Sequence, residues 1–145
     1  MARPKDYRDL IVWQKSMELA RHAYAQIAAL PKSESYGLAG QIRRAAISIP
    51  SNIAEGHGRL SDLQFRHFLG NARGSVCELR TQIELSADLG YLGAESAKDL
   101  MERSAEVTRL LNGLISALRP HRSDPKSPGS ANSANPANSA PKGHR

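Results

Sequence analysis

Arginine recurs at every seventh position through the middle of the chain, at Arg59, Arg66, Arg73 and Arg80. On an α-helix this repeat returns to nearly the same side, so the four side chains would form one stripe with about 10 Å between neighbours. A row of cations can follow a phosphate backbone, and it can equally form ion pairs with carboxylates. The choice between these roles depends on which acids face the stripe.

A second stripe, this one acidic, lies further along the chain. It consists of Glu95, Asp99, Glu102 and Glu106. If the helices that carry the two stripes form a hairpin that turns near Tyr91, Arg80 lies opposite residue 103, Arg73 opposite residue 110 and Arg66 opposite residue 117. We therefore expect the acids to reach Arg80 and to miss Arg66 and Arg73.

The candidate nucleic-acid-binding residues are Arg43, Arg59, Arg66 and Arg73. Arg43 joins them because pairing of the helices before and after residues 57–60 brings it close to Arg73. Three interpretations stay open for these arginines, namely nucleic-acid contact, pairing at a subunit interface, and solvated charge. With one Trp and 5% aromatic residues, the chain offers no stacking platform, so any binding would be driven by the backbone and weakly sequence-specific.

The Glu, His, Cys and Gly patterns do not fit a catalytic, metal or cofactor site. A di-iron bundle needs Glu-x-x-His motifs, whereas Glu18 and His22 are four positions apart. The sequence EGHG at 55–58 lacks the Lys-Ser/Thr of a phosphate-binding loop, and Cys77 has no evident activating partner beyond Arg73 or Arg80. We expect no catalytic residue, no metal and no cofactor, and therefore a protein that is not an enzyme.

The elements that must position these side chains are four segments with apolar residues at helical spacing. They run over about residues 10–27, 38–56, 61–89 and 94–118. The apolar face expected on the first segment consists of Leu10, Trp13, Met17, Ala20, Tyr24 and Ile27, and that on the third of Phe65, Leu69, Ala72, Val76, Leu79 and Ile83. Gly56 ends the second segment in a position suited to a left-handed C-cap. No segment reads as a strand. The pattern predicts an all-α fold, an antiparallel up-down-up-down four-helix bundle over residues 1–119.

Within the second segment, Pro50 interrupts the apolar pattern, yet Ile53 follows Ile49 by four positions as a continuous helix requires. We predict a helix that is kinked at Pro50 rather than broken there. Polar residues form matching lines on the second and third helices. The expected polar network comprises Arg44, Ser48, Asn52, Glu55, Ser75 and Glu78. We expect an Arg44–Glu78 bond in it, and a role in fixing helix register rather than in binding a ligand.

Residues 120–145 consist mainly of Pro, Ser, Asn, Ala and Gly, with no aliphatic residue larger than alanine. Such a segment cannot offset the entropy of its own ordering, so we predict a disordered basic tail. It carries four cations and one carboxylate, which is half of the net charge of +6. A solubility tail and a sequence-independent nucleic-acid tether are both open interpretations.

The single cysteine excludes an internal disulfide framework, and the longest apolar run near the N-terminus is too short for a signal peptide or a membrane span. We expect a cytoplasmic protein with no membrane partner.

Three long motifs carry a family resemblance. They are YRDLIVWQKSMELA, QIRRAAISIPSNIAEGHGR and FLGNARGSVCELRTQIELSADLGYL. Over about residues 7–115 the chain resembles the four-helix-bundle proteins first noticed as reading frames inside intervening sequences of bacterial 23S ribosomal RNA genes. It is also similar to the accessory protein of diversity-generating retroelements, a basic pentameric barrel associated with nucleic acid and a reverse transcriptase. The resemblance implies a bacterial source and a ring-like pentamer.

The leading hypothesis is therefore a non-enzymatic, oligomeric helical bundle that contacts nucleic acid through a basic surface of the second and third helices. RNA is the preferred candidate for that nucleic acid, and DNA is the other. The alternative is a protein–protein interaction scaffold whose arginines form subunit contacts.

Overall fold

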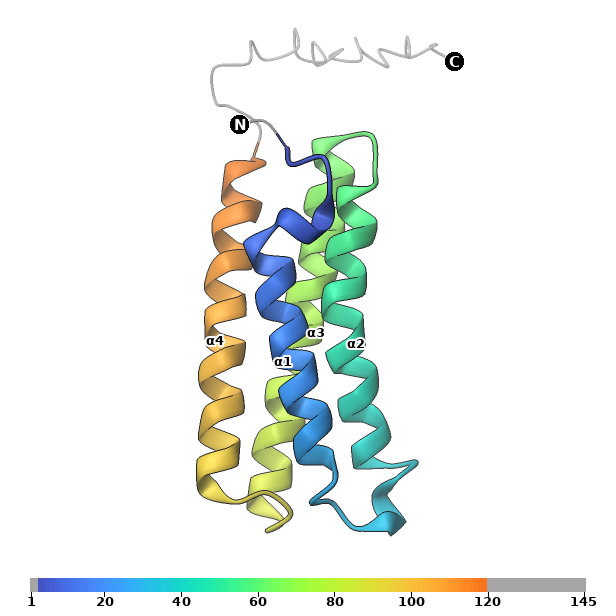
Figure 1. The fold of residues 1–145 in the computed structure, drawn as a ribbon, viewed down its shortest axis with the longest axis vertical. Helices are drawn as coiled ribbons and strands as arrows, with labels where there is room; N and C mark the ends of the chain where they lie inside the picture. Colours follow the sequence, from blue (N-terminus) through green and yellow to red (C-terminus); the bar gives the residue numbers. More distant parts are fainter. Residues whose placement is uncertain (1–2, 120–145) are drawn as a thin grey trace, which may run out of the picture.

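The computed structural model describes residues 3–119, which form an antiparallel four-helix bundle (Figure 1). Its α-helices are α1 (Ile11–Ile27), α2 (Leu38–His57), α3 (Asp62–Asp88) and α4 (Ala94–Ala117), and two short 3-10 helices, η1 (Tyr7–Asp9) and η2 (Lys32–Glu34), precede α1 and α2. No strand occurs in this part of the chain. The predicted all-α class is confirmed, while the predicted tail, 120–145, lies outside the described residues.

The four α-helices form a closed ring in cross-section. Each packs against its neighbours in sequence, and α1 also packs against α4. The helices alternate in direction, so the α2–α3 turn lies at the same end of the bundle as the N-terminal segment and the end of α4 (Figure 1). The α1–α2 and α3–α4 connections lie at the opposite end. Arg59 and Arg66 therefore belong to one end of the bundle, and Arg43 belongs toward the other.

The core follows the predicted apolar positions closely on α3 and less closely on α1. All six apolar positions expected on α3, from Phe65 to Ile83, are buried. On α1 the expected face included Trp13 and Met17, whereas the buried line is Val12, Ser16, Leu19 and Ala23. Trp13 instead packs at the edge of the core, where its ring meets that of Tyr7 at 5.3 Å. Ser16 can be buried because its hydroxyl donates to the Trp13 carbonyl at 2.7 Å.

α2 continues through Pro50, which is buried inside the helix, so the predicted continuity is confirmed. The kink expected at this residue stays a prediction. The C-cap predicted at Gly56 is wrong, because α2 extends to His57 and Gly90, at 78°, is the only glycine with a positive φ among the described residues. Gly56 is buried, and a Cβ at this position would lie 2.6 Å from Cβ of Phe68. Close approach of α2 and α3 explains this glycine.

The α2–α3 turn is held in place by the N-cap of α3 and by contacts from the N-terminal segment. Ser61 caps α3, since its Oγ accepts a hydrogen bond from the backbone N–H of Gln64 at 3.2 Å. From the N-terminal segment, Arg3 donates to the carbonyl of Arg59 at 3.0 Å and forms an ion pair with Asp62. The guanidinium of Arg3 also lies 4.7 Å from the centre of the Phe65 ring.

Candidate nucleic-acid interface

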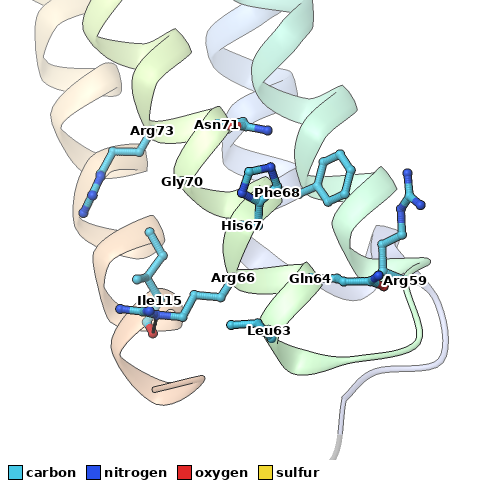
Figure 2. A pocket seen from close by; sticks show the side chains of 10 residues that line it. All are labelled: Arg59, Leu63, Gln64, Arg66, His67, Phe68, Gly70, Asn71, Arg73 and Ile115. Carbon is cyan, nitrogen blue, oxygen red and sulfur yellow. Dashed lines mark hydrogen bonds between the residues drawn. The ribbon is translucent and has the colours of Figure 1, made fainter. Parts of the chain in front are cut away.

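Three of the four candidate arginines line one open groove of about 700 Å³ on α3, beside the α2–α3 turn (Figure 2). The residues that line it are Arg59, Leu63, Gln64, Arg66, His67, Phe68, Gly70, Asn71, Arg73 and Ile115. None of these is acidic. Arg59, Arg66 and Arg73 therefore share one groove, but only Arg66 and Arg73 lie on α3, which begins at Asp62, and Arg80 does not line the groove. The predicted single stripe of four arginines is wrong for Arg59.

Arg66 and Arg73 reach toward α4, where both meet neutral acceptors (Figure 2). Nε of Arg66 donates to the Ile115 carbonyl at 3.3 Å, and Nη1 of Arg73 donates to Oδ1 of Asn112 at 3.0 Å. Neither arginine forms an ion pair with any carboxylate in residues 3–119. Both partners lie within one turn of the positions expected from the α3–α4 hairpin. The bonds orient the two guanidinium groups and leave their charge intact.

Arg80, in contrast, does not meet the acidic stripe as expected. Its Nη1 donates to the Met101 carbonyl at 3.1 Å and to Oγ of Ser104 at 2.9 Å. Asp99 pairs instead with Arg103 at 3.0 Å on its own helix. Arg80 is half-buried at the α3–α4 contact and lies outside the groove.

Two further acids of the stripe, Glu102 and Glu106, also pair away from α3, which is the physical reason that the prediction for Arg80 is wrong. Glu106 lies 3.9 Å from Lys15 on α1, and Glu102 lies 3.9 Å from Lys98. The acidic stripe thus follows the α1 side and the outer side of α4.

Arg59 lies on the α2 side of the groove and is partly neutralised. Its Nη2 donates to Oε1 of Glu55, one turn earlier, at 2.9 Å. The guanidinium also covers the Phe68 ring, with its central carbon 4.7 Å from the ring centre. Because the ion pair is exposed at both ends, a polyanion could compete for Arg59 at small cost. Arg59 is therefore a weaker cation than Arg66 or Arg73.

Arg43 lies elsewhere, and the expected proximity to Arg73 is wrong. The bond between Ser48 and Ser75 sets the α2–α3 register, which places Arg43 opposite Arg80. Its Nη2 donates to the Ser35 carbonyl at 2.6 Å, in the connection between α1 and α2. At 1.5 Å per residue, Arg43 and Arg59 are separated by about 24 Å along α2.

The predicted polar network exists in a smaller form. Oγ of Ser48 and Oγ of Ser75 are 2.7 Å apart, and Nδ2 of Asn52 donates to Oγ of Ser48 at 3.0 Å. Nδ2 of Asn52 also donates to the Ser48 carbonyl at 2.8 Å, and Ser75 donates to the Asn71 carbonyl at 3.2 Å. Of these contacts, only the Ser48–Ser75 hydrogen bond joins α2 to α3, and the others lie within one helix. The expected role in fixing helix register stays a prediction.

The outer members of that network are not part of it. The predicted Arg44–Glu78 bond is wrong, because both side chains are exposed and neither forms a side-chain hydrogen bond or ion pair within residues 3–119. Glu55 pairs with Arg59 instead. Helix rotation, not register, is the cause: the Ser48–Ser75 contact places Arg44 level with residue 79, but both charged side chains are exposed.

Within residues 3–119, no group of three or more His, Cys, Asp or Glu side chains is arranged to hold a metal ion. Over the same residues, no helix is long and apolar enough to cross a membrane. Cys77 is exposed on α3 and forms no disulfide. Sequence reasoning missed Asn112 and Ile115, the α4 partners of Arg73 and Arg66, because a hairpin register identifies a neighbour only to within one helical turn.

Among solved structures, the chain is similar to a protein of unknown function from the S23 ribosomal protein family of Bacteroides thetaiotaomicron. The two sequences are 26% identical and the TM-score is 0.68, with 72% of this chain and 98% of the other chain covered. No curated protein matches the chain. The model of the family described as 23S rRNA-intervening sequence protein matches residues 8–113, from η1 to near the end of α4. The chain belongs to the 23S rRNA-intervening sequence protein family.

Proposed function

We propose that this protein is a non-enzymatic, oligomeric helical bundle of the cytoplasm that contacts nucleic acid, in particular RNA, through the groove lined by Arg59, Arg66 and Arg73. One observation carries the proposal. Arg66 and Arg73 donate hydrogen bonds to uncharged oxygen atoms on α4, so both keep their full positive charge in an open groove. The family is described by its link to ribosomal RNA genes, which favours RNA as the polyanion. The resemblance to ring-forming proteins favours a pentamer that repeats the groove around its ring.

Arg66 and Arg73 would act as pre-oriented phosphate contacts. Each uses one N–H group on α4, so the other donors of each guanidinium can bind phosphate oxygens. A side chain that is already held by a hydrogen bond loses less conformational entropy when it binds a partner. The contact would be with the sugar–phosphate backbone, and its affinity would fall steeply with salt.

The basic segment 120–145 would extend this surface. α4 ends at Ala117, two residues after Ile115, whose carbonyl binds Arg66. The chain therefore leaves the bundle beside the groove, which is the position from which four further cations add most to the same electrostatic field.

The test is an RNA titration with the full chain and a double charge reversal, Arg66→Glu with Arg73→Glu. A matched control reverses Arg21 and Arg44, two exposed arginines outside the groove, and so has the same net charge. Each lost phosphate contact lowers the slope of log affinity against log salt by about 0.7 to 0.9, so the groove variant should lose about 1.5 slope units or more. A chain truncated after Arg119 should show a smaller loss.

Two results would reject the proposal. One is the absence of RNA binding by the intact oligomer at low salt. The other is an equal loss in the groove variant and in the control, because affinity would then follow net charge and not the groove.

A second candidate function is a protein–protein interaction scaffold in which the same arginines contact a neighbouring subunit. Two leucines at the groove end favour it, since Leu60 is fully exposed in the α2–α3 turn and Leu63 is 71% exposed. Exposed leucines beside cations are typical of a surface that another protein covers. Under this function the Arg66/Arg73 reversal changes the mass of the oligomer in solution, which light scattering measures, and RNA affinity is absent from the start.

A further inference from the structure

We infer that the groove receives the phosphate backbone of base-paired RNA, and that this backbone crosses α3 at Gly70, between Arg66 and Arg73. The inference rests on the proposed function and adds to it the kind of RNA and the point of contact. Figure 2 shows Gly70 on α3 between the two arginines, both of which extend toward α4.

Among residues 3–119, no neighbouring atom explains why position 70 is glycine. It lies in the interior of α3, where glycine costs about 1 kcal/mol relative to alanine. A Cβ at this position would have no heavy atom within 4 Å, so the fold would accept a side chain. Glycine is the residue that allows another backbone to approach most closely. The open space above Gly70 is therefore available to a ligand.

Position 70 lies between the two arginines along α3, so its side chain determines whether a ligand can contact both. Gly70 is four residues after Arg66 and three before Arg73, and the arginines are about 10 Å apart along the helix. Gly70 lines the groove between the two arginines, so a phosphate backbone that follows the groove from one arginine to the other passes this residue. A long side chain at position 70 would stand in that path, whereas glycine leaves it clear.

The aromatic residues of the groove favour paired over unpaired RNA. Proteins that bind single strands stack exposed bases on free aromatic faces. Phe68, the only phenylalanine that lines the groove, is half-buried and covered by Arg59 at 4.7 Å. The His67 ring lies edge-on to Phe68, with 5.7 Å between ring centres. A duplex needs no stacking surface, because it is recognised through its backbone and its shape, and it presents more charge per unit length than one strand.

The experiment compares Gly70→Gln with Gly74→Gln in the full chain. Gly74 lies one turn further along α3, is exposed, and likewise has no atom within 4 Å of a Cβ, but it does not line the groove. The probes are an RNA duplex of about 20 base pairs, longer than the roughly 16 that a double-stranded-RNA-binding domain spans, and one of its strands alone. We expect Gly70→Gln to weaken duplex binding at least about tenfold at 0.1 M salt and to reduce the salt slope by about 1.5, since two phosphate contacts are lost. Gly74→Gln should bind as the unaltered chain does.

Each outcome separates this inference from the function on which it rests. If the unaltered chain binds neither probe, the proposed function fails, and the inference fails with it. If it binds RNA but Gly70→Gln and Gly74→Gln bind equally well, the contact at Gly70 is refuted while the proposed function stands. Tighter binding of the single strand than of the duplex refutes the preference for paired RNA. Light scattering on every variant must give the same mass, because a change confined to Gly70→Gln would place this glycine in a subunit contact and overturn the inference.

Discussion

Gly56 and Gly70 are both glycines inside helices, and their surroundings are opposite. At Gly56, α2 and α3 approach so closely that a Cβ would lie 2.6 Å from Phe68, whereas a Cβ at Gly70 would meet nothing within 4 Å. The first glycine is needed for the bundle to close. Within residues 3–119 the second has no packing role, which leaves the surface that it shares with Arg66 and Arg73 open in this part of the chain.

The polar residues on the two sides of α3 differ in the same way. Toward α2, Ser48, Asn52 and Ser75 bond to one another and present little to a ligand. Toward α4, Arg66 and Arg73 each use one donor on a neutral acceptor and keep the rest. Regular spacing of polar residues therefore does not by itself identify a binding site. Polar side chains that hydrogen-bond to one another have the same spacing as polar side chains that keep donors free for a ligand.

The largest effect on stability should come from adding a side chain at Gly56, where α2 and α3 are in close contact. We expect Gly56→Leu to lower the free energy of unfolding by about 3 kcal/mol, because the added side chain forces α2 away from Phe68 and Phe65. Gly70→Leu is the matched control and should leave stability unchanged or raise it by up to about 1 kcal/mol through better helix propensity. Urea unfolding measures both. Equal losses in the two variants would remove the contrast between closed and open glycines.

The next effect separates two arginines of the seven-residue repeat. Arg80→Met should cost about 1.5 kcal/mol of stability, because a half-buried guanidinium loses bonds to the Met101 carbonyl and to Ser104. Arg73→Met should cost less than about 0.5 kcal/mol, because Arg73 is exposed. The same urea experiment measures the two, and a larger loss for Arg73 would contradict the assignment of Arg80 to structure and Arg73 to the surface.

The strength of each sequence signal explains what could be predicted. The six apolar positions of α3 were predictable because they extend over five turns with one period, and only one face of a helix can follow such a line. The face of α1 was not, because Val12 and Leu19 alternate with Trp13 and Met17 along neighbouring lines, and packing against the other helices decides between them. Local pattern determines that a helix is amphipathic more reliably than it determines its rotation.

The site was predictable only in part for a related reason. The seven-residue spacing predicted that Arg66 and Arg73 lie on the same side of α3. The geometry of the α3–α4 hairpin predicted the positions of their partners on α4 to within one helical turn. Spacing could not show that Gly56 faces Phe68, since a glycine after an apolar stripe is also the common signature of a helix end. Contacts of this kind depend on a second helix and are absent from the local sequence.

A smaller effect tests the closed network itself. Ser48→Ala and Ser75→Ala should each cost about 1 kcal/mol, and the double variant should cost less than their sum by about 0.5 kcal/mol or more, because one hydrogen bond is removed in all three. Ser86 provides the control, since its hydroxyl donates only to the Gln82 carbonyl of its own helix. Ser48→Ala combined with Ser86→Ala should be additive. Coupling in the control pair, or additivity in the first pair, would show that the Ser48–Ser75 bond does not hold the register.

The smallest effect on stability should come from freeing Arg59. Glu55→Gln removes an exposed ion pair and should change the free energy of unfolding by less than about 0.5 kcal/mol. Under the proposed function, however, it gives Arg59 back its full charge, so RNA affinity should rise several-fold and the salt slope should increase by up to about 0.9. Glu78→Gln removes the same charge from an exposed site outside the groove, and it should leave the salt slope unchanged. An equal gain in both variants would mean that RNA responds to net charge alone, and the open side of α3 would then be no more specific for RNA than the rest of the surface.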